Sequence, residues 1–309
     1  MQFASADHVG KPIVVARSGD GLVDATPLLG DAVAEEPMIA LVRLLAEGAI
    51  DASALSGLPA LQESEVTITP LVRRPGKIIA APINYDDHKA EMKQLGDVSA
   101  LGFFLKSPSS VLADGGTVIL PYSDRRFDQE GELAVVIGKG GKNIAERDVA
   151  RHIAGYTCLL DITMRGGEDR STRKSFDTFT PVGPYLVTAD EVGDLATMTL
   201  ESRVNGTLRQ DADIAELIWG VERFISYVSS VTTLEPGDII TTGTPAGVGS
   251  IDDGDRVEVT ISNVGTLSVA VSAQGAVLSP TKGAQVGPKP PETVTPLRQR
   301  TADGRLTKL

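Results

Sequence analysis

Cysteine and aromatic residues are scarce in this sequence. The single cysteine, Cys158, excludes an intrachain disulfide and is typical of a protein from a reducing compartment. Aromatic residues make up only 4% of the chain, whereas there are 32 glycines and 18 prolines. Glycine and proline favour turns, so this composition indicates a turn-rich protein with many short strands.

Positive charge and long apolar runs are also lacking. The chain has 29 Lys and Arg against 41 Asp and Glu, a formal net charge of −12. Nucleic-acid binding needs clustered basic side chains, so we expect no nucleic-acid partner, and an anionic substrate would need a local positive centre such as a metal ion. No apolar run approaches the roughly 18 residues of a membrane span, and the N-terminal residues lack the apolar core of a signal peptide. We therefore expect a cytoplasmic protein without membrane contact.

The length of 309 residues suits one large domain or two unequal ones. We expect a small N-terminal α/β domain at residues 1–72, with a strand in "KPIVVARSG" and a helix in "EEPMIALVRLLAEGAI". A catalytic domain should follow at residues 73–280. Residues 281–309 are polar and rich in proline, so they cannot form a core of their own. This extended tail is expected to lie against a protein surface.

The central part of the chain consists of short apolar segments separated by Gly, Pro and Asp, a pattern that predicts strands. Residues 255–271 predict a hairpin. Two helices are expected, at residues 145–155 and at residues 213–228, where Asp213 and Glu216 form a capping-box pattern. Many strands and few helices, without repeated βαβ units, predict a sheet-rich α+β fold with mixed or antiparallel sheets.

Several well-known catalytic motifs do not occur. The glycine-rich stretches "GKGGKN" and "GTPAGVG" lack the spacing of a phosphate-binding loop or a dinucleotide fingerprint, so they predict turns. The chain contains no CxxC, HExxH or G-x-S-x-G sequence, which leaves zinc hydrolase and serine esterase functions without support.

The stretch "FDQEGELAVVIG" places Asp128, Glu130 and Glu132 at alternate positions of an expected strand. Side chains alternate between the faces of a strand, so the three carboxylates should share one face. Such a cluster either faces water or surrounds a cation, because like charges repel. Glu130 and Glu132, with Asp161 at the end of "CLLDIT", could bind a hard cation.

Two other residues could carry chemistry. His88 precedes Glu91 by three positions, so within a helical turn the carboxylate could orient the imidazole as a general base. A surface histidine beside an unrelated glutamate would have the same spacing. Lys174 lies in the irregular stretch "TRKSFDTFTPVGP", where a lysine by itself indicates little.

Five stretches between about residues 77 and 271 together resemble the fumarylacetoacetate hydrolase superfamily, in the order in which its signatures occur. They are "KIIAAPINYDDHKAEM", "FFLKSPSSVL", "DQEGELAVVIGK", "KSFDTFTPVGPYLVT" and "VSSVTTLEPGDIITTGTPAGVG". The resemblance implies that the catalytic domain is a mixed β-roll. It also implies a divalent cation, Mg²⁺ or Mn²⁺, with Glu130, Glu132 and Asp161 as ligands. His88 and Glu91 match the His-x-x-Glu dyad on the lid of bacterial-type members, where the pair activates water.

The resemblance further implies contacts with substrate. Lys174 matches the family's active-site lysine and Thr244 its substrate-contacting threonine. Arg165 keeps the position of a family arginine, whereas Glu168 stands where a glutamine is common. Asn84 replaces the aspartate of the liver-type branch, which makes that branch's substrate a poor match.

The implied activity is hydrolysis of a C–C bond in a small 2,4-diketo acid of the acylpyruvate type, within aromatic or sugar-acid catabolism. Decarboxylation of an oxaloacetate-type acid, or keto–enol isomerisation of a 2-hydroxy-dienoate, could use the same site. A non-catalytic scaffold stabilised by metal is a further alternative. The resemblance also implies a homodimer.

Overall fold

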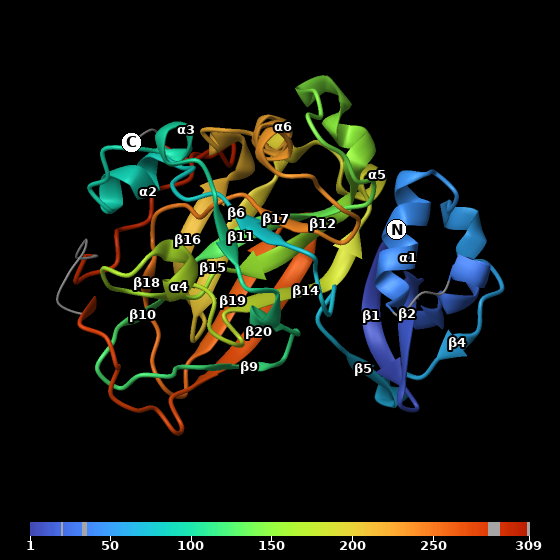
Figure 1. The fold of residues 1–309 in the computed structure, drawn as a ribbon, viewed down its shortest axis with the longest axis horizontal. Coiled ribbons are helices and arrows are strands. Elements are labelled where there is room, and N and C mark those ends of the chain that lie inside the picture. The colour runs from blue at the N-terminus through green and yellow to red at the C-terminus, as the bar shows by residue number, and fades with distance from the viewer. Residues whose placement is uncertain (20, 33–35, 284–290, 308–309) are drawn as a thin grey trace.

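The computed structural model describes residues 1–19, 21–32, 36–283 and 291–307 (Figure 1). Its largest sheet links the N-terminal strands to the centre of the molecule. Within the described ranges this sheet has twelve strands, in the spatial order β4 (Ala60–Leu61), β3 (Gly21–Asp24), β2 (Lys11–Ser18), β1 (Gln2–His8), β14 (Thr180–Val187), β12 (Ile153–Leu160), β11 (Gly131–Ile137), β17 (Ile239–Thr241), β6 (Ile78–Ala80) and β7 (Phe104–Lys106), with β5 (Val66–Ile68) beside β1 and β8 (Val111–Leu112) beside β14.

Two smaller sheets complete the β-structure seen in the described part of the chain. One orders β16 (Thr207–Asp213), β15 (Thr199–Val204), β19 (Arg256–Ile261), β20 (Gly265–Ser272) and β9 (Thr117–Ile119), and the other orders β13 (Thr163–Met164), β10 (Phe127–Gln129) and β18 (Gly249–Ser250). Most neighbours are antiparallel, but the pairs β6–β17, β8–β14 and β9–β20 are parallel. The expected α+β fold with mixed sheets is confirmed, and β19 with β20 forms the expected hairpin.

Helices are short and few among these residues: α1 (Pro37–Ala46), α2 (Asp86–Glu91), α3 (Val98–Leu101), α4 (Arg170–Arg173), α5 (Ala189–Val192) and α6 (Val221–Val231). None of them combines the length and apolar character needed to cross a bilayer. Residues 146–152 form a 3₁₀ helix where we expected an α-helix.

The helix expected from Asp213 begins only at Val221. The capping box of Asp213 and Glu216 closes a 3₁₀ turn, after which Leu217 forms an isolated bridge with Tyr85 and residues 218–219 bend. Asn84 causes this break, because its backbone carbonyl accepts from the Ile218 amide and its side-chain oxygen accepts from the Trp219 amide. These two amides therefore cannot donate within a continuous helix.

The centre of the large sheet is covered on both faces. Alternate residues of β11 enter different cores: Leu133 and Val135 pack in the core that includes β15 and β19, whereas Ala134 and Val136 pack in the core that includes α1. Every residue of β11 and β12 is buried for this reason. Acidic side chains placed on these strands are consequently shielded from solvent.

The two ends of the chain are attached to its central part, residues 73–280, which is called the body below. β1 pairs with β14, so the N-terminal segment shares a sheet with the following residues, and the division into residues 1–72, 73–280 and 281–309 stays a prediction. Residues 291–307 of the expected tail lie on the body, where Arg298 pairs with Glu216 and Arg300 with Asp211. Tail residues 284–290 and 308–309 fall outside the described residues.

Candidate functional site

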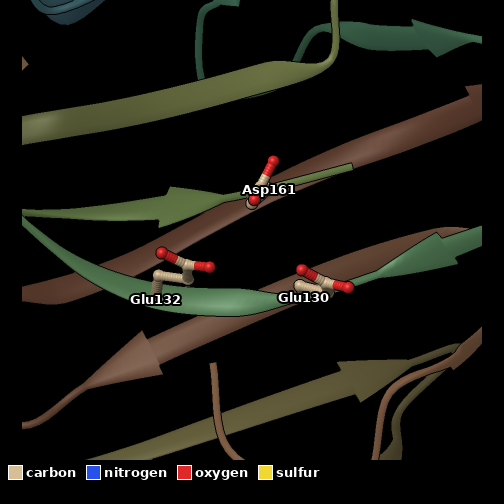
Figure 2. A group of neighbouring side chains, drawn as sticks. All are labelled: Glu130, Glu132 and Asp161. Atoms are coloured by element: carbon tan, nitrogen blue, oxygen red, sulfur yellow. The ribbon is translucent and has the colours of Figure 1, made fainter. Parts of the chain in front are cut away.

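Three acidic side chains lie together where β11 meets β12. In the antiparallel register Gly131 is opposite Leu160, and the amide of Asp161 donates to the carbonyl of Glu130 at 2.8 Å. Oxygen atoms of Glu130, Glu132 and Asp161 all lie within 4.8 Å of one another. Figure 2 shows Glu132 on β11 and Glu130 just before that strand, with Asp161 facing them. Their residues are at most 4% exposed, which rules out a solvated strand face.

The surroundings of Glu132 differ from those of its two neighbours. Its Oε2 accepts hydrogen bonds from the Thr241 hydroxyl and, at 2.9 Å, from the Gly243 amide. Burial, together with the nearby charge of Asp161, raises the pKa of Glu132 to about 8. A positive charge bound beside Glu132 would lower this pKa and would therefore favour the ionised carboxylate.

Two buried lysines compensate part of the negative charge. The ammonium of Lys174 lies 2.7 Å from Glu130 and 2.5 Å from Asp161, and donates to Thr163 at 2.6 Å. Lys106 donates to the other oxygen of Asp161 and to the carbonyl of Phe179. Burial lowers the pKa of Lys106, although Asp161 opposes the effect.

Lys106 was not predicted from the sequence. It belongs to the quoted stretch "FFLKSPSSVL", where the only signal was a lysine ending an apolar strand segment. Its residue is 2% exposed, and its partner Asp161 lies 55 positions further along the chain. A pairing between positions so far apart needs the tertiary structure to be recognised.

Arg165 orients the carboxylates at the outer end of the cluster. Its guanidinium donates to Asp128 at 2.7 Å and to Glu130 at 2.9 Å, and Arg126 also pairs with Asp128. Burial opposes ionisation of Glu130, but Lys174 and Arg165 hold its pKa below the usual range. Asp128 is thus neutralised by two arginines and both oxygens of Asp161 accept from lysines, whereas Glu132 accepts only from a hydroxyl and a backbone amide among the described residues.

A divalent cation fits this set of residues. Carboxylate oxygens are the ligands that Mg²⁺ and Mn²⁺ prefer, and three buried ones converge here. Burying three carboxylates is costly without matching positive charge, and Glu132 is held by a hydroxyl and an amide instead of a lysine. The cluster therefore forms a candidate metal centre.

His88 and Glu91 lie on α2, and His88 lines a cavity that also reaches Glu130 of the cluster. The imidazole Nδ1 is 2.9 Å from Oε2 of Glu91, and both side chains are at most 4% exposed. The cavity is lined by His88, Glu130, Arg165 and Lys174, together with Pro82, Ile83, Met92, Gln94, Phe104, Gly166, Arg170 and Arg173. The imidazole therefore faces the same space as Glu130 of the cluster and Lys174.

The "GTPAGVG" stretch is a loop, as expected. Its backbone amides bind both Glu132 of the carboxylate cluster and Glu91 of the dyad. The Gly243 amide donates to Glu132, and the Gly247 amide donates to Glu91 at 2.9 Å. Gly247 has a φ of 99°, and a Cβ there would lie 1.9 Å from the carbonyl oxygen of Arg209. Only glycine can occupy this position without displacing the backbone that supports Glu91.

Two of the expected substrate contacts are engaged elsewhere. Glu168 accepts two hydrogen bonds from Arg125, at 2.9 and 2.7 Å, which lower its pKa to about 2. The Thr244 hydroxyl accepts from Gln210 at 2.7 Å and donates to the Gly131 carbonyl at 2.9 Å. Neither residue belongs to the cavity lining given above. The structure therefore brings Arg165 and Lys174 to the cavity, but not Glu168 or Thr244.

The comparison with known families agrees with this geometry. The family model described as "Fumarylacetoacetate (FAA) hydrolase C-terminal" matches residues 77–272. The chain belongs to the fumarylacetoacetate hydrolase family. It is also similar to maleylpyruvate hydrolase of Aquipseudomonas alcaligenes, with 41% identity over 226 residues, which cover 69% of this chain and 78% of that protein.

Two further relatives extend the comparison. The crystal structure of maleylpyruvate hydrolase from Sphingobium sp. SYK-6, in complex with manganese(II) ion and pyruvate, is 38% identical with a TM-score of 0.76, over 90% of this chain and all of that one. The mitochondrial oxaloacetate tautomerase Fahd2a of Rattus norvegicus is 37% identical over 222 residues, which cover 68% of this chain and 71% of that protein. Family members of this type thus include both hydrolases and a tautomerase.

Proposed function

We propose that this protein is a divalent-metal-dependent hydrolase that cleaves a C–C bond in a 2,4-diketo acid of the acylpyruvate type. The observation that carries the proposal is the shared cavity, in which His88, paired with Glu91, faces Glu130 and Lys174. Hydrolysis needs a base for water beside a centre that stabilises negative charge. A metal-bound scaffold would need the carboxylates alone. The similarity to two maleylpyruvate hydrolases supports the same reaction class.

Glu130, Glu132 and Asp161 are the residues proposed to hold Mg²⁺ or Mn²⁺. The cation would act as a Lewis acid on the oxygens of a bound oxo acid, and would supply the positive centre that this acidic chain otherwise lacks. Arg165 keeps Glu130 oriented, and Thr241 and Gly243 keep Glu132 oriented. Such supporting contacts set the direction in which ligand oxygens point.

The dyad and Lys174 are the proposed catalytic residues. Because Nδ1 of His88 is hydrogen-bonded to Glu91, Nε2 is the nitrogen that takes a proton from water. The water oxygen attacks the 4-carbonyl carbon and the bond between C3 and C4 breaks. The acyl half leaves as a carboxylic acid, and the enolate of pyruvate takes at C3 the proton that His88 removed from water. Lys174 lies at the cavity and stabilises the negative charge of that enolate. Closure of α2 over the cavity excludes bulk water from these groups.

The direct test is a substrate panel assayed with Mg²⁺ and with Mn²⁺. Loss of acylpyruvate absorbance should be matched by an equal amount of pyruvate, measured with a coupled dehydrogenase. Glu132→Gln should abolish this activity. Pyruvate release that is unaffected by chelation of divalent cations would contradict the proposal.

A second candidate is keto–enol tautomerisation or decarboxylation of an oxaloacetate-type acid. The similarity to the rat oxaloacetate tautomerase favours including it. Both reactions pass through an enolate, so they would use Lys174 and the carboxylate cluster without an attacking water. Oxaloacetate belongs in the same panel, followed by its enol absorbance and by its disappearance.

We also propose that the protein is a homodimer, on the basis of its family membership. Light scattering at micromolar concentration tests the assembly, since a 32.4 kDa species would be a monomer.

Substrate contacts by Glu168 and Thr244 stay predictions. Either contact would require the side chain to leave its present partners.

A further inference from the structure

The buried carboxylate of Glu91 makes hydrogen bonds with His88 on its own helix and with two distant parts of the chain. Its Oε2 faces Nδ1 of His88 at 2.9 Å, whereas Oε1 accepts from the Gly247 amide at 2.9 Å and from the hydroxyl of Thr295 at 2.5 Å. The Glu91 side chain has no solvent exposure, so protein donors replace water here. Because Thr295 and Gly247 both bind Oε1, they determine that Oε2 is the oxygen that faces His88.

Thr295 belongs to a segment that ion pairs attach to the body and to α2. Arg298 donates to Glu216 at 2.7 Å, and its guanidinium lies 3.8 Å from Asp87, the residue before His88 on α2. Arg300 donates to Asp211 of β16 at 2.9 Å. In Figure 1 this red C-terminal segment runs beside α2. The ion pairs of two arginines that follow Thr295 therefore attach its segment to α2 and to β16, which holds the Thr295 hydroxyl in place.

We propose that Thr295 is a positioning residue for the dyad, through which residues 291–307 keep Glu91 aligned with His88. The proposal rests on the function proposed above, because it assigns Thr295 to the same reaction. Without this donor, the Glu91 carboxylate can rotate about its terminal torsion, which is a soft motion. Rotation would release Nδ1 of His88 and reduce the fraction of imidazole with Nε2 free to accept a proton. Thr295 does not line the substrate cavity, so its loss should act on kcat and leave KM unchanged.

Thr295→Val removes the hydroxyl while keeping a branched side chain. We expect kcat for acylpyruvate cleavage to fall by about tenfold, the low end for a hydrogen bond to a charged group, because the Gly247 amide still donates. KM should change by less than about twofold, and Thr295→Ser should restore kcat. Thr301→Val is the matched control, since the Thr301 hydroxyl donates at 2.8 Å to the Arg305 carbonyl within the same segment. That control should behave as the unmodified enzyme.

Nitrogen NMR provides a readout that needs no substrate. The chain has three histidines, so the His88 signals can be assigned by their loss in His88→Asn. The unmodified protein should show neutral His88 protonated at Nδ1, and Thr295→Val should show a mixture of the two tautomers. Unchanged tautomers together with an unchanged kcat would overturn the proposal.

A double substitution separates positioning from general stability. In a Glu91→Gln background, Thr295→Val should cause no further loss of kcat, because both changes act through the same carboxylate. A full additional tenfold loss would overturn the proposal. If the unmodified enzyme cleaves no acylpyruvate, the proposed function fails, while the tautomer measurement still decides the role of Thr295.

Discussion

Replacing His88 with asparagine separates its role as a base from its role in packing. The side-chain amide of asparagine places a donor near the position of Nδ1, so the buried Glu91 carboxylate keeps a partner. Asparagine cannot accept a proton from water at neutral pH. The variant therefore removes the proposed general base while the supporting hydrogen bonds from Gly247 and Thr295 to Glu91 remain.

The expected loss in acylpyruvate cleavage is about 10²–10⁴-fold, the usual contribution of a general base, or roughly 3–5 kcal/mol in the activation barrier. His88→Ala should lose at least as much, because it also leaves Glu91 with one fewer donor. Glu91→Gln should lose less than His88→Asn, since it orients the base without taking the proton. Decarboxylation of oxaloacetate needs no attacking water, so His88→Asn should spare most of any such activity.

The assay compares two substrates on the same protein preparation. Acylpyruvate cleavage is followed by absorbance and pyruvate release, and oxaloacetate by its disappearance, each at saturating Mg²⁺. Lys174→Ala serves as the comparison, because it should reduce both activities through the shared enolate. Equal losses of the two activities in His88→Asn, or full acylpyruvate cleavage by that variant, would refute the assignment of His88 as the base.

Three further predictions follow from the buried groups. Lys106→Met should lower the free energy of unfolding of the metal-free protein by about 3 kcal/mol, because Asp161 loses a buried partner but keeps Lys174. Urea titration measures this change, and an unchanged midpoint of the unfolding transition would contradict it. Chelation with EDTA should abolish activity, and Glu132→Gln should weaken Mn²⁺ binding by more than about tenfold in calorimetry; equal affinity would exclude this residue as a ligand. Burial raises the pKa of the Cys158 thiol to about 12, so a thiol reagent should label the protein only after denaturation; rapid labelling of the folded protein would count against this burial.

Local patterns in the sequence were sufficient for much of the fold. The strand alternation and the turn residues predicted β19 and β20 as a hairpin, and the apolar spacing predicted α1, because neighbours in sequence create those preferences. The helix expected from Asp213 was wrong in its start, since Asn84 takes two amide donors that the helix would need. That competition comes from a residue on another element, which no local pattern contains.

The sequence by itself determined that acidic residues alternate where an apolar strand begins, and that the chain carries the motifs of the fumarylacetoacetate hydrolase family. Strand periodicity and motif order are properties of consecutive residues. Only the tertiary structure decided that Asp161 faces Glu130, because this depends on the register of β11 against β12. Only the tertiary structure paired Lys106 with Asp161 and placed Thr295 against Glu91, 204 positions earlier in the chain. Contacts at such separations depend on how whole sheets and segments pack, so they appear only once the chain has folded.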